Sequence, residues 1–312
     1  MTIATSHSST VPLASGWSAL PPEYAIPDEA PTEAEAREYC RRLARSHYEN
    51  FSVASWFLPE RLRQHFFNVY AYCRISDDLG DEVGDTAASL QLLDQWETEL
   101  NACYDGHPRH PVFVALAETV RKFEIPKHEF ADLLTAFRQD QSVSRYETFN
   151  DLLGYCRYSA NPVGHLVLYL CGYRDSDRQL LSDYTCTALQ LANFWQDVSA
   201  DFAKGRIYLP LEDLRRFGVS EETIREGENT LAFCRMLKFE VERAREWFTQ
   251  GLPLIAKVDR KLATDIELFS RGGQEILNAI ECQNCAVLGR RPAISKTRKL
   301  ALVARAALGK LR

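Results

Sequence analysis

Residues 190–210 read QLANFWQDVSADFAKGRIYLP, and this stretch indicates the fold more directly than any other part of the chain. Asn193, Asp197 and Asp201 recur at intervals of four residues, so a helix would align their oxygen-bearing side chains along one stripe. The apolar run LQLANFW leads into the stripe, which predicts a helix packed inside a domain. Like charges at this spacing cost a helix about 0.2–0.5 kcal/mol. The pattern therefore indicates that a cation is needed between the carboxylates.

A second aspartate pair has the same spacing. Asp77 and Asp81 lie in SDDLGDE (76–82), after the apolar run VYAYCRI (69–75). Mg²⁺ prefers oxygen ligands and is commonly held by one or two carboxylates together with substrate phosphates. Two pairs that face each other across a cavity would form a clamp for magnesium and a diphosphate.

Basic side chains accompany both pairs. Arg74 stands one turn before Asp77, and the segment KGRIYLP (204–210) follows Asp201. Arginine suits the bidentate capture of phosphate oxygens. The same groups could instead form ordinary ion pairs, Arg74 with Asp77 or Asp78 and Lys204 with Asp201, and the sequence leaves both interpretations open.

The chain as a whole predicts one large all-α domain, residues 31–312, after a disordered leader, residues 1–30, rich in Ser, Thr, Ala and Pro. With 312 residues and 46% hydrophobic content, it can bury a large core. Apolar residues recur at helical spacing most clearly in segments 112–124, 128–140, 178–203 and 231–250. The breaks are expected at Pro59, Gly106 to Pro111, Pro126, Pro162, Pro210 and Pro253.

Charge and cysteine usage exclude several classes of protein. A net charge of −6 and the lack of a nucleic-acid-binding motif argue against nucleic acid as a partner. The nine scattered cysteines indicate a reducing compartment, and Cys282 and Cys285 are interpreted as buried helix residues. Without a signal peptide or a long apolar run, we expect a cytoplasmic protein. The basic tail LALVARAALGKLR (300–312) could lie on the inner face of an anionic membrane, or pack on the domain.

Six segments of the chain carry a further signal when they are taken together. They are HYENF (47–51), VYAYCRISDDLGDE (69–82), RYETFNDLLGYC (145–156), SANPVGHLVLYLCG (159–172), QLANFWQDVSADFAKGRIYLP (190–210) and GRRPAISK (289–296). These segments resemble the squalene and phytoene synthases, which join two prenyl diphosphates head to head. The resemblance runs from about His47 to Lys299 and implies a single-domain isoprenoid synthase fold, with the aspartate motifs on opposing helices around a central cavity.

The resemblance also implies roles for individual residues. Asp77, Asp81, Asp197 and Asp201 would bind Mg²⁺ that bridges to the diphosphate, with Asn193 assisting. Together with Arg74, the four aspartates are the candidate catalytic residues. The other positions that match residues around the substrate are Phe51, Tyr70, Gln190 and Arg291.

Several departures from the usual family pattern look like the bacterial hydroxysqualene synthase branch of squalene and hopanoid biosynthesis. That branch ionises presqualene diphosphate and captures the rearranged cation with water, so NADPH is not expected. The departures are Tyr48 and Asn50 in place of small hydroxyl residues, Asn161 and Pro162 in a small-residue segment, Gln196 in place of arginine, and Cys285 in place of tyrosine. Asn50, Asn161 and Gln196 could contact the substrate and position the water, although buried amides are also common packing groups.

Other functions stay open at this point. A squalene synthase would couple the same ionisation to NADPH, and a phytoene synthase would condense two prenyl diphosphates. A terpene cyclase could share the acidic stripe but not the GRIYLP (205–210) and GRRPAISK (289–296) segments. A noncatalytic helical scaffold would explain the periodicity but not the paired carboxylates. The expected partners are a lipophilic prenyl diphosphate and, through its pathway, other enzymes.

Overall fold

The structure, a computed structural model, describes residues 20–46, 60–295 and 297–298. These residues form helices and one isolated bridge, between Arg145 and Ile207, and contain no strand, so the all-α prediction is confirmed. The helices are α1 (Glu33–Ser46), α3 (Glu60–Asp81), α4 (Thr86–Asp105), α5 (Pro111–Phe123), α6 (His128–Gln139), α7 (Phe149–Ser159), α8 (Asn161–Leu170), α9 (Ser176–Ala203), α10 (Leu211–Phe217), α11 (Glu221–Arg225), α12 (Leu231–Gly251) and α13 (Arg260–Cys282), with the 3-10 helices η2 (Pro22–Tyr24) and η3 (Leu252–Lys257).

Local signals explain where these helices begin. The side chain of Asp175 accepts a hydrogen bond from the backbone of Arg178 and so caps α9, and Thr148 caps α7 in a reciprocal pair with Asp151. Pro162 lies in the first turn of α8, where its missing N–H costs nothing. The four segments predicted from periodicity correspond to α5, α6, α9 and α12, with each boundary within two residues.

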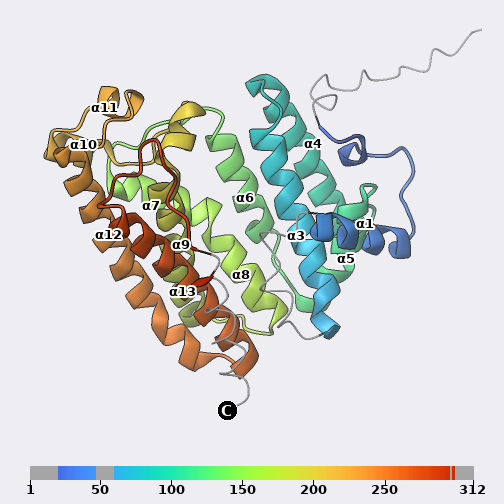
Figure 1. Ribbon diagram of the computed structural model, residues 1–312. Coiled ribbons are helices and arrows are strands. Elements are labelled where there is room, and N and C mark those ends of the chain that lie inside the picture. The colour runs from blue at the N-terminus through green and yellow to red at the C-terminus, as the bar shows by residue number, and fades with distance from the viewer. Residues whose placement is uncertain (1–19, 47–59, 296, 299–312) are drawn as a thin grey trace, which may run out of the picture.

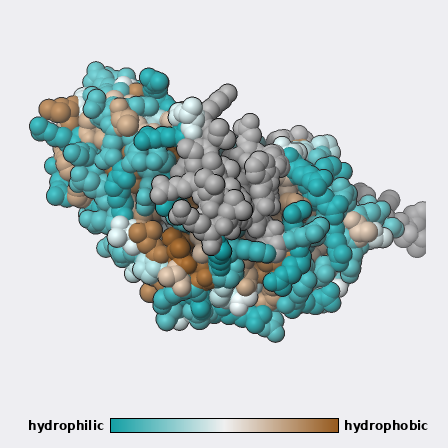
Figure 2. All heavy atoms as spheres, turned by 60° about the horizontal axis from the view of Figure 1, so that its bottom comes forward, coloured by the Kyte–Doolittle hydropathy of each residue, from teal (hydrophilic) through white to brown (hydrophobic). Residues whose placement is uncertain are grey.

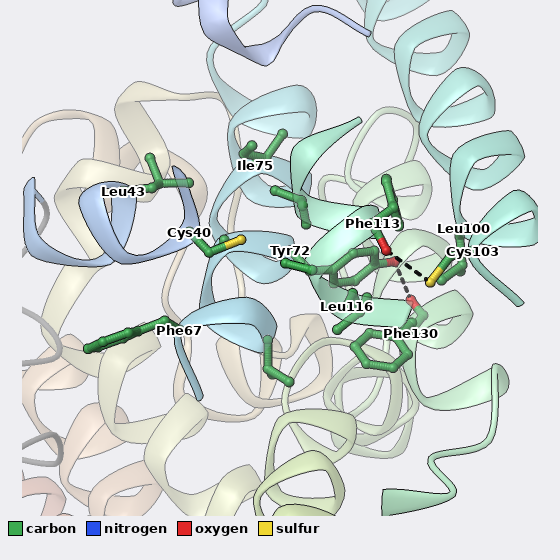
Figure 3. Close-up of a cluster of buried hydrophobic side chains, with 14 of the residues drawn as sticks. Cys40, Leu43, Phe67, Tyr72, Ile75, Leu100, Cys103, Phe113, Leu116 and Phe130 are labelled. Carbon is green, nitrogen blue, oxygen red and sulfur yellow. Dashed lines mark hydrogen bonds between the residues drawn. The ribbon is translucent and has the colours of Figure 1, made fainter. Parts of the chain in front are cut away.

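The core consists of two clusters of buried side chains, joined by the central helices α6 and α8 (Figure 1). The first lies among α1, α3, α4 and α5 and contains Tyr72, which is fully buried. Its hydroxyl donates to the backbone oxygen of Phe130 at 2.8 Å, and its ring meets Phe113 and Phe130 edge-on (Figure 3). This satisfied hydrogen bond and the aromatic contacts fix α3 against α5 and α6.

The second cluster surrounds α9, which packs against α12 and α13. Trp195 of α9 is fully buried in it, and Phe194 stacks on Tyr208 with 3.9 Å between ring centroids. The two clusters therefore hold α3 and α9 as rigid elements on either side of α6 and α8.

The prediction of a disordered leader is wrong for its last part. Leu20 and Tyr24 are buried, at 6% and 2% exposure, and the Tyr24 hydroxyl donates to Asp78 of α3 at 2.8 Å. The sequence shows little helical periodicity here, but the buried side chains of Leu20 and Tyr24 and a hydrogen bond from Tyr39 to the backbone oxygen of Glu23 anchor this segment. Residues 1–19 and the basic tail from residue 299 onward lie outside the described residues.

The cysteine prediction is partly wrong as well. The nine cysteines are free thiols, in agreement with a chain without disulfides. However, Cys282 is exposed at the end of α13, and Cys285 is buried but lies beyond the helix at a positive φ of 61°. Within the described chain, none of the helices combines the length and apolar character needed to cross a bilayer.

Candidate active site

One face of α3 changes from apolar to charged along its length. Phe66, Tyr70, Arg74, Asp77 and Asp81 follow one another at steps of three or four residues, which places them on the same side of the helix. On α9, Cys186 and Leu189 likewise precede the stripe that contains Asp197 and Asp201. Both helices thus carry apolar side chains near their middle and carboxylates near their C-terminal ends.

An apolar cavity of about 330 Å³ lies between the apolar parts of α3, α8, α9 and α13. Its walls include Phe66, Tyr70, Leu168, Leu189, Ile266 and Phe269. Phe269 is 44% exposed, so the cavity reaches the surface. Figure 2, which brings the lower side of Figure 1 forward, shows hydrophobic patches within a mostly hydrophilic surface. The cavity suits a flexible hydrocarbon chain.

Asp265, an acid that the sequence argument missed, also lines this cavity. It is only 5% exposed and lies on α13 between Leu262 and Ile266, on the apolar stripe of that helix. The sequence contains a signal for Asp265, because an acidic residue interrupts a helical stripe that is otherwise apolar.

Ion pairs join the two aspartate motifs at the charged end of the cavity walls. The guanidinium of Arg206, just after α9, donates to Asp81 at the end of α3 over 2.9 Å, and the Lys204 ammonium donates to the same carboxylate over 3.2 Å. The pairing of Lys204 with Asp201 that the sequence left open is therefore replaced by a pairing with Asp81. The motifs face each other, as the resemblance implied.

Arg74 makes a bidentate ion pair with Asp78, its neighbour one turn along α3. Its Nη1 also lies 3.9 Å from the Asp77 carboxylate, so the ion-pair interpretation of this arginine holds in the structure. Asp78 is 5% exposed and receives a further hydrogen bond from Tyr24. Asp78 thus fixes the position of the Arg74 guanidinium beside the first motif.

Arg291 plays the corresponding part at the second motif. Its guanidinium donates through Nε and Nη2 to the two oxygens of Asp197, with 2.9 Å for the Nη2 contact. Nη2 also lies 3.2 Å from the side-chain oxygen of Gln196. Four basic side chains, those of Arg74, Lys204, Arg206 and Arg291, therefore contact the two motifs.

The carboxylates at this end repel one another. Burial raises the pKa of Asp201 to about 7, and the neighbouring charge of Asp197 adds to the rise. The Asp77 side chain is 51% exposed, yet the protein around it removes hydration and, with the charge of Asp81, raises its pKa to about 6. Such crowding is typical of a functional site that binds a cation.

A further acid, Asp140, follows α6 directly and belongs to the same site. It was not predicted from the sequence. Its Oδ2 accepts a hydrogen bond from Tyr155 at 2.8 Å, while Oδ1 is buried without a partner among the described residues. Burial raises the pKa of Asp140 to about 6, against the opposing charge of Arg206. Tyr155 lies in the GYC part (154–156) of a segment that resembles the family, so the sequence contained a signal for this tyrosine. No local sequence pattern indicated Asp140 as a site residue.

The remaining predicted residues divide into three groups. Asn193 is exposed on the acidic stripe, and Gln190 is half-buried a turn before Phe194. Asn161 is 9% exposed and accepts a hydrogen bond from Thr187 at 3.0 Å. It borders a polar cavity with His165 rather than the described lining of the apolar one. Tyr48, Asn50 and Phe51 lie outside the described residues.

The donor set suits magnesium better than a softer metal. The side chains of both motifs offer carboxylate oxygens, and Asn193 adds an amide oxygen, which are the ligands that Mg²⁺ prefers. In the described part of the chain, no three or more His, Cys, Asp or Glu side chains form a ready-made metal cluster. Burial, with the added charge of a neighbouring aspartate, raises the pKa values of Asp77 and Asp201, and a bound divalent cation would offset both effects.

Comparisons with known proteins show which sequences and folds this chain is similar to. The model of the squalene/phytoene synthase family matches residues 44–298. The 15-cis-phytoene synthase of Synechocystis sp. is 31% identical over 278 residues, which cover 85% of this chain and 82% of the relative.

Two solved structures share the fold. The squalene synthase HpnC from Alicyclobacillus acidocaldarius is 44% identical, with a TM-score of 0.77, and the match covers 86% of this chain and 98% of that one. A dehydrosqualene synthase in complex with a ligand is 28% identical, with a TM-score of 0.80, over 88% and 96% of the two chains.

Proposed function

This chain belongs to the squalene/phytoene synthase family, and we propose that it ionises presqualene diphosphate and captures the rearranged cation with water, giving hydroxysqualene and diphosphate. The observation that supports this most is the 44% identity with the squalene synthase HpnC, against 31% or less with the phytoene synthases compared. The departures at Asn161 and Gln196 point to the same branch.

The arrangement of the cavity fits an amphipathic substrate. The apolar walls between α3, α9 and α13 would take the hydrocarbon, while the aspartate motifs and their basic partners would take the diphosphate. Magnesium held by Asp77, Asp81, Asp197 and Asp201, with help from Asn193, would supply positive charge to the departing diphosphate.

The side chains of this protein provide the remaining electrostatics. Arg74 and Arg206 are held in place by Asp78 and Asp81, so their guanidinium groups are already oriented near the leaving group. Such preorganised charge stabilises a developing anion without reorganisation during the reaction. The walls around Tyr70 are mostly apolar, so they would keep water away from the carbocation while it rearranges.

The second candidate is a phytoene synthase, which the names of several relatives favour. It differs in substrate, because two prenyl diphosphates would be condensed instead of one being ionised. A basic tail that contacts the inner face of a membrane stays part of the proposal for either function, since the hydrocarbon product would be released into lipid.

One experiment distinguishes these functions. The purified protein is incubated with Mg²⁺ and either presqualene diphosphate, farnesyl diphosphate or geranylgeranyl diphosphate, with and without NADPH, and the products are identified by mass spectrometry. Hydroxysqualene from presqualene diphosphate without NADPH is the expected result. Squalene that forms only with NADPH, or phytoene from geranylgeranyl diphosphate, would contradict the proposal.

A further inference from the structure

The segment that follows α13 lies along α9 and is held there by two consecutive turns of that helix. The backbone N–H of Gly289 donates to the Ser199 hydroxyl at 3.3 Å. Three residues earlier on α9, the Gln196 amide donates to the backbone oxygen of Pro292 at 2.6 Å. Gln196 is 6% exposed and Pro292 is buried, so this contact is shielded from solvent.

Gln196 uses both ends of its amide on neighbouring residues of this segment. Its Nε2 holds Pro292, and its Oε1 accepts from the guanidinium of Arg291 at 3.2 Å. Loss of these hydrogen bonds would leave buried polar groups of Gln196 without partners, which costs free energy. The two contacts therefore hold the segment around Arg291 and Pro292 in one position. They place Arg291 directly over Asp197, which is the next residue of α9.

Arg291 and a metal ion would use the same carboxylate. The guanidinium engages both oxygens of Asp197, so a cation that binds these oxygens must displace at least one of its contacts. The Arg291 side chain is 59% exposed, whereas Asp197 is 15% exposed, so the arginine is free to turn outward while the aspartate stays in place. The hydrogen bond from Gln196 to the backbone oxygen of Pro292 does not involve Asp197, so it would persist and keep the backbone of Arg291 in place.

We propose that Gln196 is a positioning residue that mounts Arg291 over the second aspartate motif, and that Arg291 passes from Asp197 to the diphosphate when a metal ion takes this carboxylate. Before the substrate binds, Arg291 neutralises the charge of Asp197. When the metal and the diphosphate bind, the Arg291 guanidinium contacts the phosphate oxygens instead. Planar guanidinium groups suit carboxylate and phosphate equally well. This role replaces water positioning as the function of Gln196.

The inference rests on the metal and diphosphate part of the proposed function and is independent of the final product. Two titrations by isothermal calorimetry test it: Mg²⁺ alone, and inorganic pyrophosphate in saturating Mg²⁺. The variants are R291Q, Q196L and the double variant in the full chain. R290Q is the matched control, because it removes the same charge from the adjacent exposed residue.

The expected results have opposite signs for one substitution. R291Q tightens binding of Mg²⁺ alone, because a competitor for Asp197 is gone. It weakens pyrophosphate binding by about 10- to 150-fold, the range for hydrogen bonds to charged groups. Q196L should also tighten Mg²⁺ binding and weaken pyrophosphate binding, but by smaller factors than R291Q. The double variant should have the same affinities as R291Q. R290Q changes neither by more than about threefold, as expected for an exposed charge.

A rescue variant separates positioning from simple structural support. Moving the guanidinium to the helix itself, in Q196R/R291Q, should restore most of the pyrophosphate affinity lost in R291Q. If Q196L does not fold, Q196N, which shortens the side chain by one methylene, takes its place. The inference is overturned when R291Q weakens Mg²⁺ alone, when both affinities stay unchanged, or when the effects of Q196L and R291Q add. Wild-type protein without magnesium-dependent pyrophosphate binding would overturn the proposed clamp itself.

Discussion

Arg206 and Asp81 form an ion pair across 125 residues of sequence, with 2.9 Å between the guanidinium Nη1 and the carboxylate Oδ1. Their side chains are 16% and 22% exposed, so the pair is shielded from much of the solvent. Arg206 follows the second aspartate motif, and Asp81 ends the first. Together with the contact of Lys204 with the same carboxylate, this ion pair therefore links the two motifs.

Substituting Arg206 with glutamine should destabilise the protein, because Asp81 and the nearby Asp140 would lose their shared positive charge. Removal of one partner of a buried pair costs about 3–5 kcal/mol, and partial exposure reduces the expected loss here to roughly 2 kcal/mol. Urea unfolding measures it. Lys204→Gln is the control, since its side chain is 54% exposed and should contribute less than about 1 kcal/mol. Equal losses in the two variants would contradict a special role for Arg206.

Asp201→Asn should abolish turnover and at the same time stabilise the protein in EDTA. Burial and the charge of Asp197 raise the pKa of Asp201 to about 7, so its ionised form is unfavourable in the folded state. An amide removes this repulsion, with an expected gain on the order of 1–2 kcal/mol. Thermal unfolding with and without Mg²⁺ checks the prediction. The gain should vanish or reverse when Mg²⁺ is added, and a lower melting temperature in EDTA would show that the carboxylate is not strained.

Tyr155→Phe should cost about 1–3 kcal/mol, because Asp140 would lose the hydroxyl that donates to it. Tyr104→Phe removes the same atom elsewhere in the core, where the acceptor is the neutral backbone oxygen of Ile125. We expect the Tyr155 variant to lose turnover as well, because Asp140 also faces Arg206. The Tyr104 variant should keep it. Steady-state rates and urea unfolding of both proteins decide the matter; similar rates would separate Asp140 from the active site.

His165 should make stability fall at alkaline pH. It lies between Glu129 and Asp183, with 2.9 Å from Nδ1 to Glu129 and 2.7 Å from Nε2 to Asp183. Burial by itself would lower the pKa of His165, but the hydrogen bonds to these acids outweigh it and raise the pKa to about 9. The unfolded pKa is about 6.5, so the stabilisation is complete below that pH and is lost as the pH rises through about 9.

The other charged groups around the polar cavity of His165 are His128, Asp132 and Arg157. Urea unfolding of wild-type protein and His165→Gln at pH 6, 8 and 10 isolates the contribution of His165 from theirs. The difference in unfolding free energy should be largest at pH 6, about 2–3 kcal/mol for a partly buried ion pair, and shrink by pH 10. A difference that does not depend on pH would mean that His165 acts through packing alone.

Features that depend on local spacing could be predicted from the sequence. The helix that carries Asp197 and Asp201 follows from its apolar periodicity, and its observed bounds, Ser176–Ala203, differ from the prediction by two residues at one end only. The repeated spacing and the family resemblance also predicted that the two aspartate motifs come together, and the contacts of Lys204 and Arg206 with Asp81 join them.

Features that depend on contacts between distant segments could not be predicted in this way. Spacing along the helix indicated Asp78 as a possible partner of Arg74, but only the fold brings Tyr24 to it from 54 residues away. Gln196 was interpreted as an amide near the substrate, because no spacing rule could bring Pro292 to it from 96 residues away. The partner of each polar side chain is decided by packing, and the sequence pattern specifies only its face of the helix.

The contact of Tyr24 with Asp78 shows that the folded domain includes residues well before the segment that matches the family. The match to the family model begins at residue 44, inside α1. Everything before that point would be trimmed from a protein shortened to the family match, including Tyr24 and most of α1. Asp78 would lose a donor, and Arg74 would be anchored less firmly beside the first motif. The part of the chain that the family model matches is therefore smaller than the part that holds the active site in shape.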